Sequence, residues 1–115
     1  MPEKNHLPHP LAQPQLLDVL LAYQEGSVVS RTLVKKSTGT LTLFAFDKGE
    51  GLSEHSTPHD AVVYIVDGAA AITIGGKESR VEAGQALLLP ANIPHALTAP
   101  VPFKMLLVMI REKEK

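Results

Sequence analysis

Short runs of strand-forming residues, separated by turn residues, make up most of the chain after residue 27. They are rich in β-branched, leucine and aromatic residues: VVSRTLVK, TLTLFAFD, AVVYIV, AAITIGG, ESRVEAG, ALLLPA and FKMLLVMI. The segments between them are rich in glycine, proline, serine and aspartate, which are typical of turns. Seven or eight short strands in about 85 residues predict an all-β barrel or sandwich, in which closure protects strand edges.

Two glycine-containing pairs lie between these runs at the spacing of a two-residue hairpin loop. They are Asp67-Gly68 and Gly75-Gly76. Both pairs are typical of the tight turns that join antiparallel neighbours, so we expect a hairpin at each.

Several of the predicted strands are apolar on both faces. In TLTLFAFD, Leu41, Leu43 and Ala45 share one face, and Phe44 and Phe46 share the other. A strand of this kind needs cover on both sides. One face would line the interior, and the other would pack on a second sheet, the N-terminal arm or another subunit. A homodimer is the most economical answer.

The first 27 residues differ from the rest of the chain in composition and in the spacing of their apolar residues. Residues 1–14 contain four prolines and scattered polar residues, which favour an extended or disordered arm. The segment 15–26 then places leucines at helical spacing between a proline and a glycine, which predicts a short helix or helical turn. It would either cover one end of the barrel or dock a partner. We therefore expect an arm with a short helix over 1–27, a barrel over 28–110 and a charged tail over 111–115.

Composition narrows the class of protein. The chain has 115 residues, room for one domain, and its 11 basic and 12 acidic residues give a net charge of −1. This balance does not favour binding to nucleic acid or to anionic membranes. There are no cysteines, which excludes disulfides and thiolate metal sites and suits a cytoplasmic location. No apolar run approaches the ~20 residues that cross a bilayer.

Histidines are the candidate chemical groups. Of five, His6 and His9 lie in the arm, where a loose metal-binding pair would have no scaffold. His55 and His59 fall in the glycine-rich stretch GEGLSEHSTPHD, and His95 ends the stretch PANIPH about forty residues later. The spacing of four places His55 and His59 on one face of an extended segment, although Pro58 can bend it. If the two loops meet in space, these imidazoles share one cavity.

These two stretches resemble the paired motifs of the cupin superfamily. The segment from Gly84 to His95 resembles the second motif, with Asn92 in place of its second glycine and Ala99 in place of its final asparagine. The segment GEGLSEHSTPHDAVVYIVDG resembles the first, with His55 at its first histidine and Gly68 at its closing glycine. The resemblance covers residues of about 28 to 110 and implies a double-stranded β-helix, or jelly-roll barrel.

The first motif is degenerate. Cupins that bind metal use two histidines and a glutamate from the first motif, together with the histidine of the second. Here Thr57 stands at the second histidine position, and Ala61 or Val62 at the glutamate position. Only His55 and His95 carry over directly, with His59 as a substitute ligand. The predicted metal ligands are therefore His55, His59 and His95, for a divalent transition metal such as Zn, Fe, Ni, Cu or Mn.

The sequence indicates the fold more clearly than the function, because one fold hosts many chemistries. The first hypothesis is a small cupin that binds a small molecule in its barrel, with or without a His-ligated metal and without an assigned catalytic activity. The resemblance also implies metal-dependent dioxygenase or isomerase chemistry, and a metal-free sensing or binding module is the third alternative. The side chains that we expect to line the pocket are Thr57, Tyr64, Phe44, Phe46, Met105 and Met109.

Overall fold

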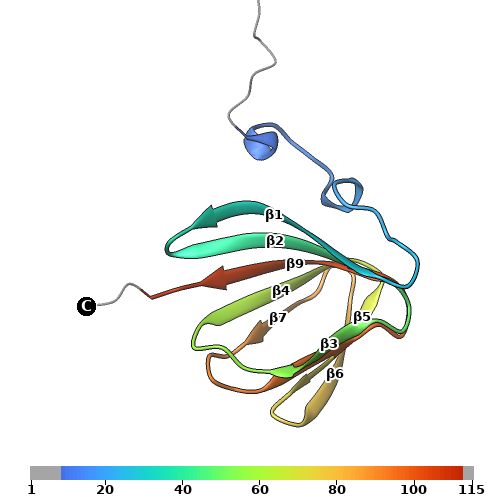
Figure 1. The fold of residues 1–115 in the computed structure, drawn as a ribbon, viewed down its shortest axis with the longest axis vertical. Helices are drawn as coiled ribbons and strands as arrows, with labels where there is room; N and C mark the ends of the chain where they lie inside the picture. The colour runs from blue at the N-terminus through green and yellow to red at the C-terminus, as the bar shows by residue number, and fades with distance from the viewer. Residues whose placement is uncertain (1–8, 113–115) are drawn as a thin grey trace, which may run out of the picture.

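Two antiparallel sheets face each other in the structure, a computed structural model that describes residues 9–112 (Figure 1). The expectations for His6, for the rest of residues 1–8 and for 113–115 lie outside the described residues. The five-stranded sheet has the order β1 (Val28–Lys36), β2 (Gly39–Phe46), β9 (Phe103–Ile110), β4 (Asp60–Asp67) and β7 (Ala86–Leu89). The four-stranded sheet has the order β3 (Gly51–His55), β8 (His95–Thr98), β5 (Ala69–Ile74) and β6 (Lys77–Glu82). The predicted all-β jelly-roll class is confirmed.

The core lies between the inner faces of the sheets. Strand β4 shows the pattern most clearly, because Ala61, Val63 and Ile65 are buried and alternate with exposed or half-buried residues. At the centre, the rings of Phe46 and Phe103 stack with centroids 4.4 Å apart and planes 10° apart. Both side chains are completely buried, so they anchor the two sheets to each other.

The interior is closed at one end and opens at the other. Along β9, Phe103 and Met105 are fully buried, whereas Leu107 and Met109 on the same face are half-buried. Strand β5 follows the same gradient, from fully buried Ile72 to half-buried Ile74. The β1–β2 hairpin, the end of β9 and the β3–β4 loop all lie at the same end of the molecule in Figure 1. We call this less buried end of the barrel the open end.

The sequence indicated a loop at β3 and no strand at β8. Each is short, five and four residues, and neither GLSEH nor HALT carries a long apolar run. Pairing with each other and with β5 stabilises them, which local sequence does not reveal. His55 is therefore the last residue of one strand and His95 the first residue of the next strand in the sheet.

The two predicted hairpins have different outcomes. Gly75 and Gly76, with φ of 56° and 86°, join β5 to β6 as a two-residue hairpin, as predicted. The prediction of a hairpin at Asp67-Gly68 is wrong, because β4 and β5 belong to different sheets. Gly68 makes the corner between them: its φ is 76°, and a Cβ there would lie 2.0 Å from the carbonyl oxygen of Pro102. Close backbone approach, and not a hairpin, requires this glycine.

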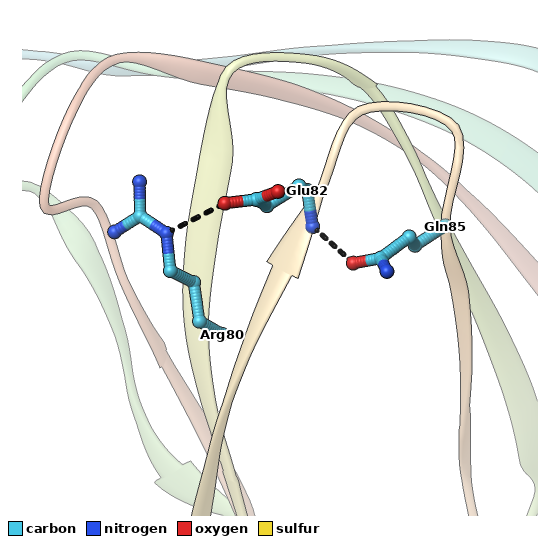
Figure 2. A network of polar contacts seen from close by, with 3 residues as sticks. All are labelled: Arg80, Glu82 and Gln85. Carbon is cyan, nitrogen blue, oxygen red and sulfur yellow. Dashed lines mark hydrogen bonds and ion pairs between the residues drawn. The ribbon is translucent and has the colours of Figure 1, made fainter.

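Polar contacts shape the corner from β6 to β7 (Figure 2). The backbone N–H of Glu82 donates to the side-chain oxygen of Gln85 at 2.8 Å, and Nε of Arg80 donates to the Glu82 carboxylate at 3.1 Å. The ion pair is solvent-exposed and contributes little stability. The turn is held instead by the Gln85 side chain and by the backbone N–H of Gln85, which donates to the carbonyl of Glu82 at 2.8 Å.

Residues 9–27 of the arm form two single turns of 3-10 helix, and these described residues contain no longer helix. These are η2 (Pro10–Ala12) and η3 (Leu17–Val19). The predicted helical turn within residues 15–26 is therefore confirmed as the single turn η3. The arm lies along the outer face of the five-stranded sheet, where Arg31 donates to the carbonyl of Leu20 and Tyr23 donates to Asp67 at 2.6 Å. No helix within residues 9–112 is long and apolar enough to cross a membrane.

Candidate functional site

His55 and His95 lie side by side at the open end of the barrel. They are paired residues of β3 and β8, and Ile74 of β5 pairs with His95 on its other side. Their Nε2 atoms are 3.2 Å apart, and their rings meet edge to face with centroids 4.4 Å apart. The two segments therefore bring these imidazoles, forty residues apart in the chain, next to each other.

Hydrogen bonds determine how both rings are protonated. Nδ1 of His55 lies 2.9 Å from the carbonyl oxygen of Ser53, and Nδ1 of His95 lies 3.2 Å from that of Ile93. A carbonyl oxygen only accepts, so each Nδ1 carries the proton and donates it. In two neutral imidazoles the facing Nε2 atoms are then both unprotonated. Two lone pairs at this distance repel each other unless a proton or a cation lies between them.

The two imidazoles differ in their exposure. His95 is a buried polar residue, with 6% of its surface exposed, whereas His55 is exposed. Burial lowers the pKa of His95, the hydrogen bond to Ile93 opposes this effect, and the nearby His55 lowers the pKa further. His95 therefore favours the neutral form, which is the form that binds a metal.

His59 is placed in a different environment. It lines a pocket of about 300 Å³ with Pro58, Asp60, Ala91, Ile110 and Glu112. Its backbone N–H donates to the hydroxyl of Thr57 at 3.3 Å, a local turn that interrupts the extended path from His55. Within residues 9–112, no three histidine or carboxylate side chains come together as a group that could hold a metal ion. The structure thus brings together two of the three predicted ligands.

The residues predicted to line a pocket divide between the two faces of the barrel. Phe46 and Met105 are fully buried in the core, and Phe44 packs against it. Met109 is half-buried and belongs to the interior face of β9. Tyr64 is 39% exposed and alternates with the buried residues of β4, so its side chain lies on the outer face, away from the imidazoles.

Two threonines were overlooked by the sequence reasoning. The interior face of β2 continues from Phe46 and Phe44 to Thr42 and Thr40, which pair with Leu107 and Met109 of β9. Both threonines are half-buried. The alternation in the segment TLTLFAF contains the signal, because residues two apart in a strand share a face. The open end therefore combines apolar side chains with hydroxyl groups.

Comparisons with known proteins agree with this architecture. The family described as "Cupin domain" matches residues 42–110. A conserved protein of unknown function from Streptococcus pyogenes is 43% identical, with a TM-score of 0.76 over 79% of this chain and 80% of that one. A cupin superfamily protein from Desulfitobacterium hafniense is 29% identical, with a TM-score of 0.85 over 90% of this chain and 95% of that one.

One curated relative, an uncharacterised protein of Streptomyces coelicolor, is 36% identical over 53 residues. The match covers 46% of this chain and 50% of that relative's length. The two antiparallel sheets that residues 9–112 form match the β-barrel of cupin neighbours. The chain belongs to the cupin domain family.

Proposed function

We propose that this cupin binds a small molecule at the open end of its barrel through a divalent transition metal held by His55 and His95. The observation that carries the proposal is the facing of two Nε2 atoms at 3.2 Å, each on a ring whose Nδ1 donates to a backbone carbonyl. This is the outer-shell pattern that orients metal-binding histidines in proteins.

The two Nε2 atoms are spaced as two ligands of one metal ion would be, and they form part of a coordination site. Two nitrogens at about 2.1 Å from one ion are about 3.0 Å apart at a right angle and about 3.4 Å apart at a tetrahedral angle. The observed separation of 3.2 Å lies between these values. Imidazole nitrogen suits Zn, Cu, Fe and Ni in particular. Other coordination positions would be filled by water or by the ligand.

The chain's own residues determine what can bind next to the imidazoles. Leu52, Ile74 and Leu107 are partly buried against the core and offer apolar contact. Thr40 and Thr42 offer hydroxyl donors and acceptors on the opposite sheet. A bound divalent metal would supply Lewis acidity toward an oxygen atom of the ligand. Dioxygenase or isomerase chemistry is the enzymatic form of this proposal.

A metal-free binding or sensing module is the second candidate. The observation that favours it is that residues 9–112 hold no third histidine or carboxylate beside the pair. In this case the small-molecule ligand would be held by the barrel interior alone.

Elemental analysis separates the two candidates. The protein is purified without a polyhistidine tag, and the metal is measured in the parent chain and in the His55→Ala, His95→Ala and His59→Ala variants. The first proposal predicts near-stoichiometric metal in the parent and in His59→Ala, the matched control, and loss of metal in the other two. A parent chain that stays metal-free after incubation with Zn²⁺, Fe²⁺, Ni²⁺, Cu²⁺ and Mn²⁺ would refute it. Metal retained by both His55→Ala and His95→Ala would refute it as well.

We also propose that the part of the outer face of the five-stranded sheet around Tyr64, Leu88 and Ile110 docks a second copy of the chain. Three neighbouring strands present apolar side chains there, including Tyr64, Leu88 and Ile110, which are 39%, 51% and 54% exposed. The central positions of this face carry no charge, so two copies can meet without like-charge repulsion. A dimer by light scattering that becomes a monomer in Leu88→Glu, but not in Val101→Glu on an exposed corner, is the expected result. A monomeric parent at high micromolar concentration excludes it. The cytoplasmic location stays a prediction.

A further inference from the structure

The loop that delivers His95 is tied to the segment that follows His55. This loop, residues 90–94 between β7 and β8, accepts or donates hydrogen bonds at three places. Ala91 N–H donates to Oδ1 of Asp60 at 2.8 Å, and Asn92 N–H donates to the carbonyl of Thr57 at 2.6 Å. The carbonyl of Pro94 accepts from the N–H of Gly75 at 2.9 Å.

Strand pairing alone does not fix the relative position of the two imidazoles. The register between β3 and β8 is irregular between Leu52 and His55, and β3 is an edge strand with a partner on one side only. An irregular ladder at an edge holds its last residue weakly. The contacts between the two loops therefore supply the constraint that the ladder lacks at His55.

Asp60 contributes the one side chain in these three hydrogen bonds; the other groups belong to the backbone. It is exposed and alternates with buried Ala61, so its carboxylate lies on the outer side of β4 and not beside the imidazoles. Asp60 is thus placed to act on His95 through the loop, without contacting a metal or a ligand.

We propose that Asp60 is a positioning residue for the imidazole pair, because its carboxylate holds loop 90–94 and thereby keeps Nε2 of His95 facing Nε2 of His55. The inference rests on the proposed metal site. It predicts that what matters at position 60 is an oxygen acceptor for Ala91 N–H, and not a negative charge.

Zinc affinity, measured by calorimetry with Zn²⁺ alone, tests the inference in three variants of the full chain. Asp60→Ala removes the acceptor and is expected to weaken Zn²⁺ binding by about 10-fold, the lower end of the effect of losing a group that orients a ligand, because Asp60 acts through the loop. Asp60→Asn keeps an oxygen acceptor and is expected to stay within about 3-fold of the parent. Glu54→Ala removes an exposed carboxylate from β3, next to His55 in sequence, and controls for charge. Parent-like affinity in Asp60→Ala, or equal losses in Asp60→Asn and Asp60→Ala, would overturn the inference.

A second measurement makes failure of the metal proposal distinguishable from failure of this one. The metal proposal fails if the parent binds none of Zn²⁺, Fe²⁺, Ni²⁺, Cu²⁺ and Mn²⁺. In that case, and also if Zn²⁺ alone does not bind, imidazole ¹⁵N spectra of the metal-free proteins decide the role of Asp60. The ring signals of both histidines should change in Asp60→Ala and match the parent in Asp60→Asn. Unchanged signals in Asp60→Ala would overturn it. Should the alanine variant not fold, Asp60→Val, which favours a strand and lacks an acceptor, takes its place.

Discussion

Gly51 is the position at which one methyl group should separate the two histidine-bearing strands. It opens β3, and its backbone runs so close to β8 that a Cβ would lie 2.2 Å from the carbonyl oxygen of Leu97. Real Cβ contacts essentially never fall below 3.0 Å. In Gly51→Ala, β3 must therefore move away from β8 by at least about 0.8 Å, the difference between these two distances.

The cost follows from the hydrogen bonds beside Gly51. Gly49 N–H donates to Ala99 O at 2.8 Å, and Ala99 N–H donates to Glu50 O at 2.9 Å. A shift of about 0.8 Å takes both beyond the ~3.2 Å limit of a good N–H···O bond. Two such bonds contribute about 1–3 kcal/mol net. Alanine restricts the unfolded chain and returns about 0.4–1 kcal/mol, so we expect a net loss of about 1–2 kcal/mol.

Urea or thermal unfolding measures this loss, and zinc affinity reports on the imidazole pair in the same variant. We expect a melting temperature lower by roughly 4–10 °C and weaker Zn²⁺ binding. Ser53→Ala, an exposed change in the same strand, controls for the substitution itself and should stay within about 0.5 kcal/mol. If Gly51→Ala is more stable than the parent, the unfolded-state effect dominates and the reasoning from the close contact is refuted.

Substitutions at three further positions test the core, the acid limit and the loop. Phe103→Ala empties a fully buried position and should cost about 3–5 kcal/mol in urea unfolding; a loss below about 1 kcal/mol would contradict the stacked core. Two backbone N–H groups hold the pKa of Asp47 below its usual 3.8, so its contribution is present above that pH and is lost as the pH falls toward the lowered pKa. Asp47→Asn should therefore flatten the fall in melting temperature at acid pH, and an unchanged profile would exclude this role. Asn92 has a φ of 67°, so Asn92→Gly should be nearly neutral, whereas Asn92→Val should lower stability by about 1–2 kcal/mol; equal stabilities would contradict the left-handed backbone.

The sequence predicted those elements whose residues alternate strongly. The seven apolar runs correspond to strands, and the glycine pair of the β5–β6 hairpin has the backbone that its sequence requires. Strands β3 and β8 escaped prediction because pairing, not local preference, stabilises them. Asp67-Gly68 was misread for a related reason. A turn sequence records backbone conformation at that point and not which sheet the chain enters next.

The sequence predicted the position of a site residue correctly where regular strand geometry determines that position, and incorrectly where a turn or a bend intervenes. His55 and His95 are ends of paired strands, so the motif spacing was enough to bring them together. His59 is separated from His55 by Pro58 and by the turn at Thr57, and even spacing no longer places both on one face. Tyr64 lies on the outer face of β4 because Ala61, Val63 and Ile65 occupy the inner face. The sequence alone did not show which of the two alternating sets of residues faces inward.

The departures from the family pattern become understandable once the loops are seen to support each other. Asn92 stands where the second motif has a glycine, and it keeps the positive φ that a glycine would provide, with its N–H on the carbonyl of Thr57. Thr57 stands where the first motif has a ligand, and it contributes a backbone carbonyl to the loop and a hydroxyl to its own turn. Both replacements thus serve the position of His95. If the pair binds metal, this chain has retained the geometry of two ligands while giving up two others, and its open coordination positions belong to the small molecule.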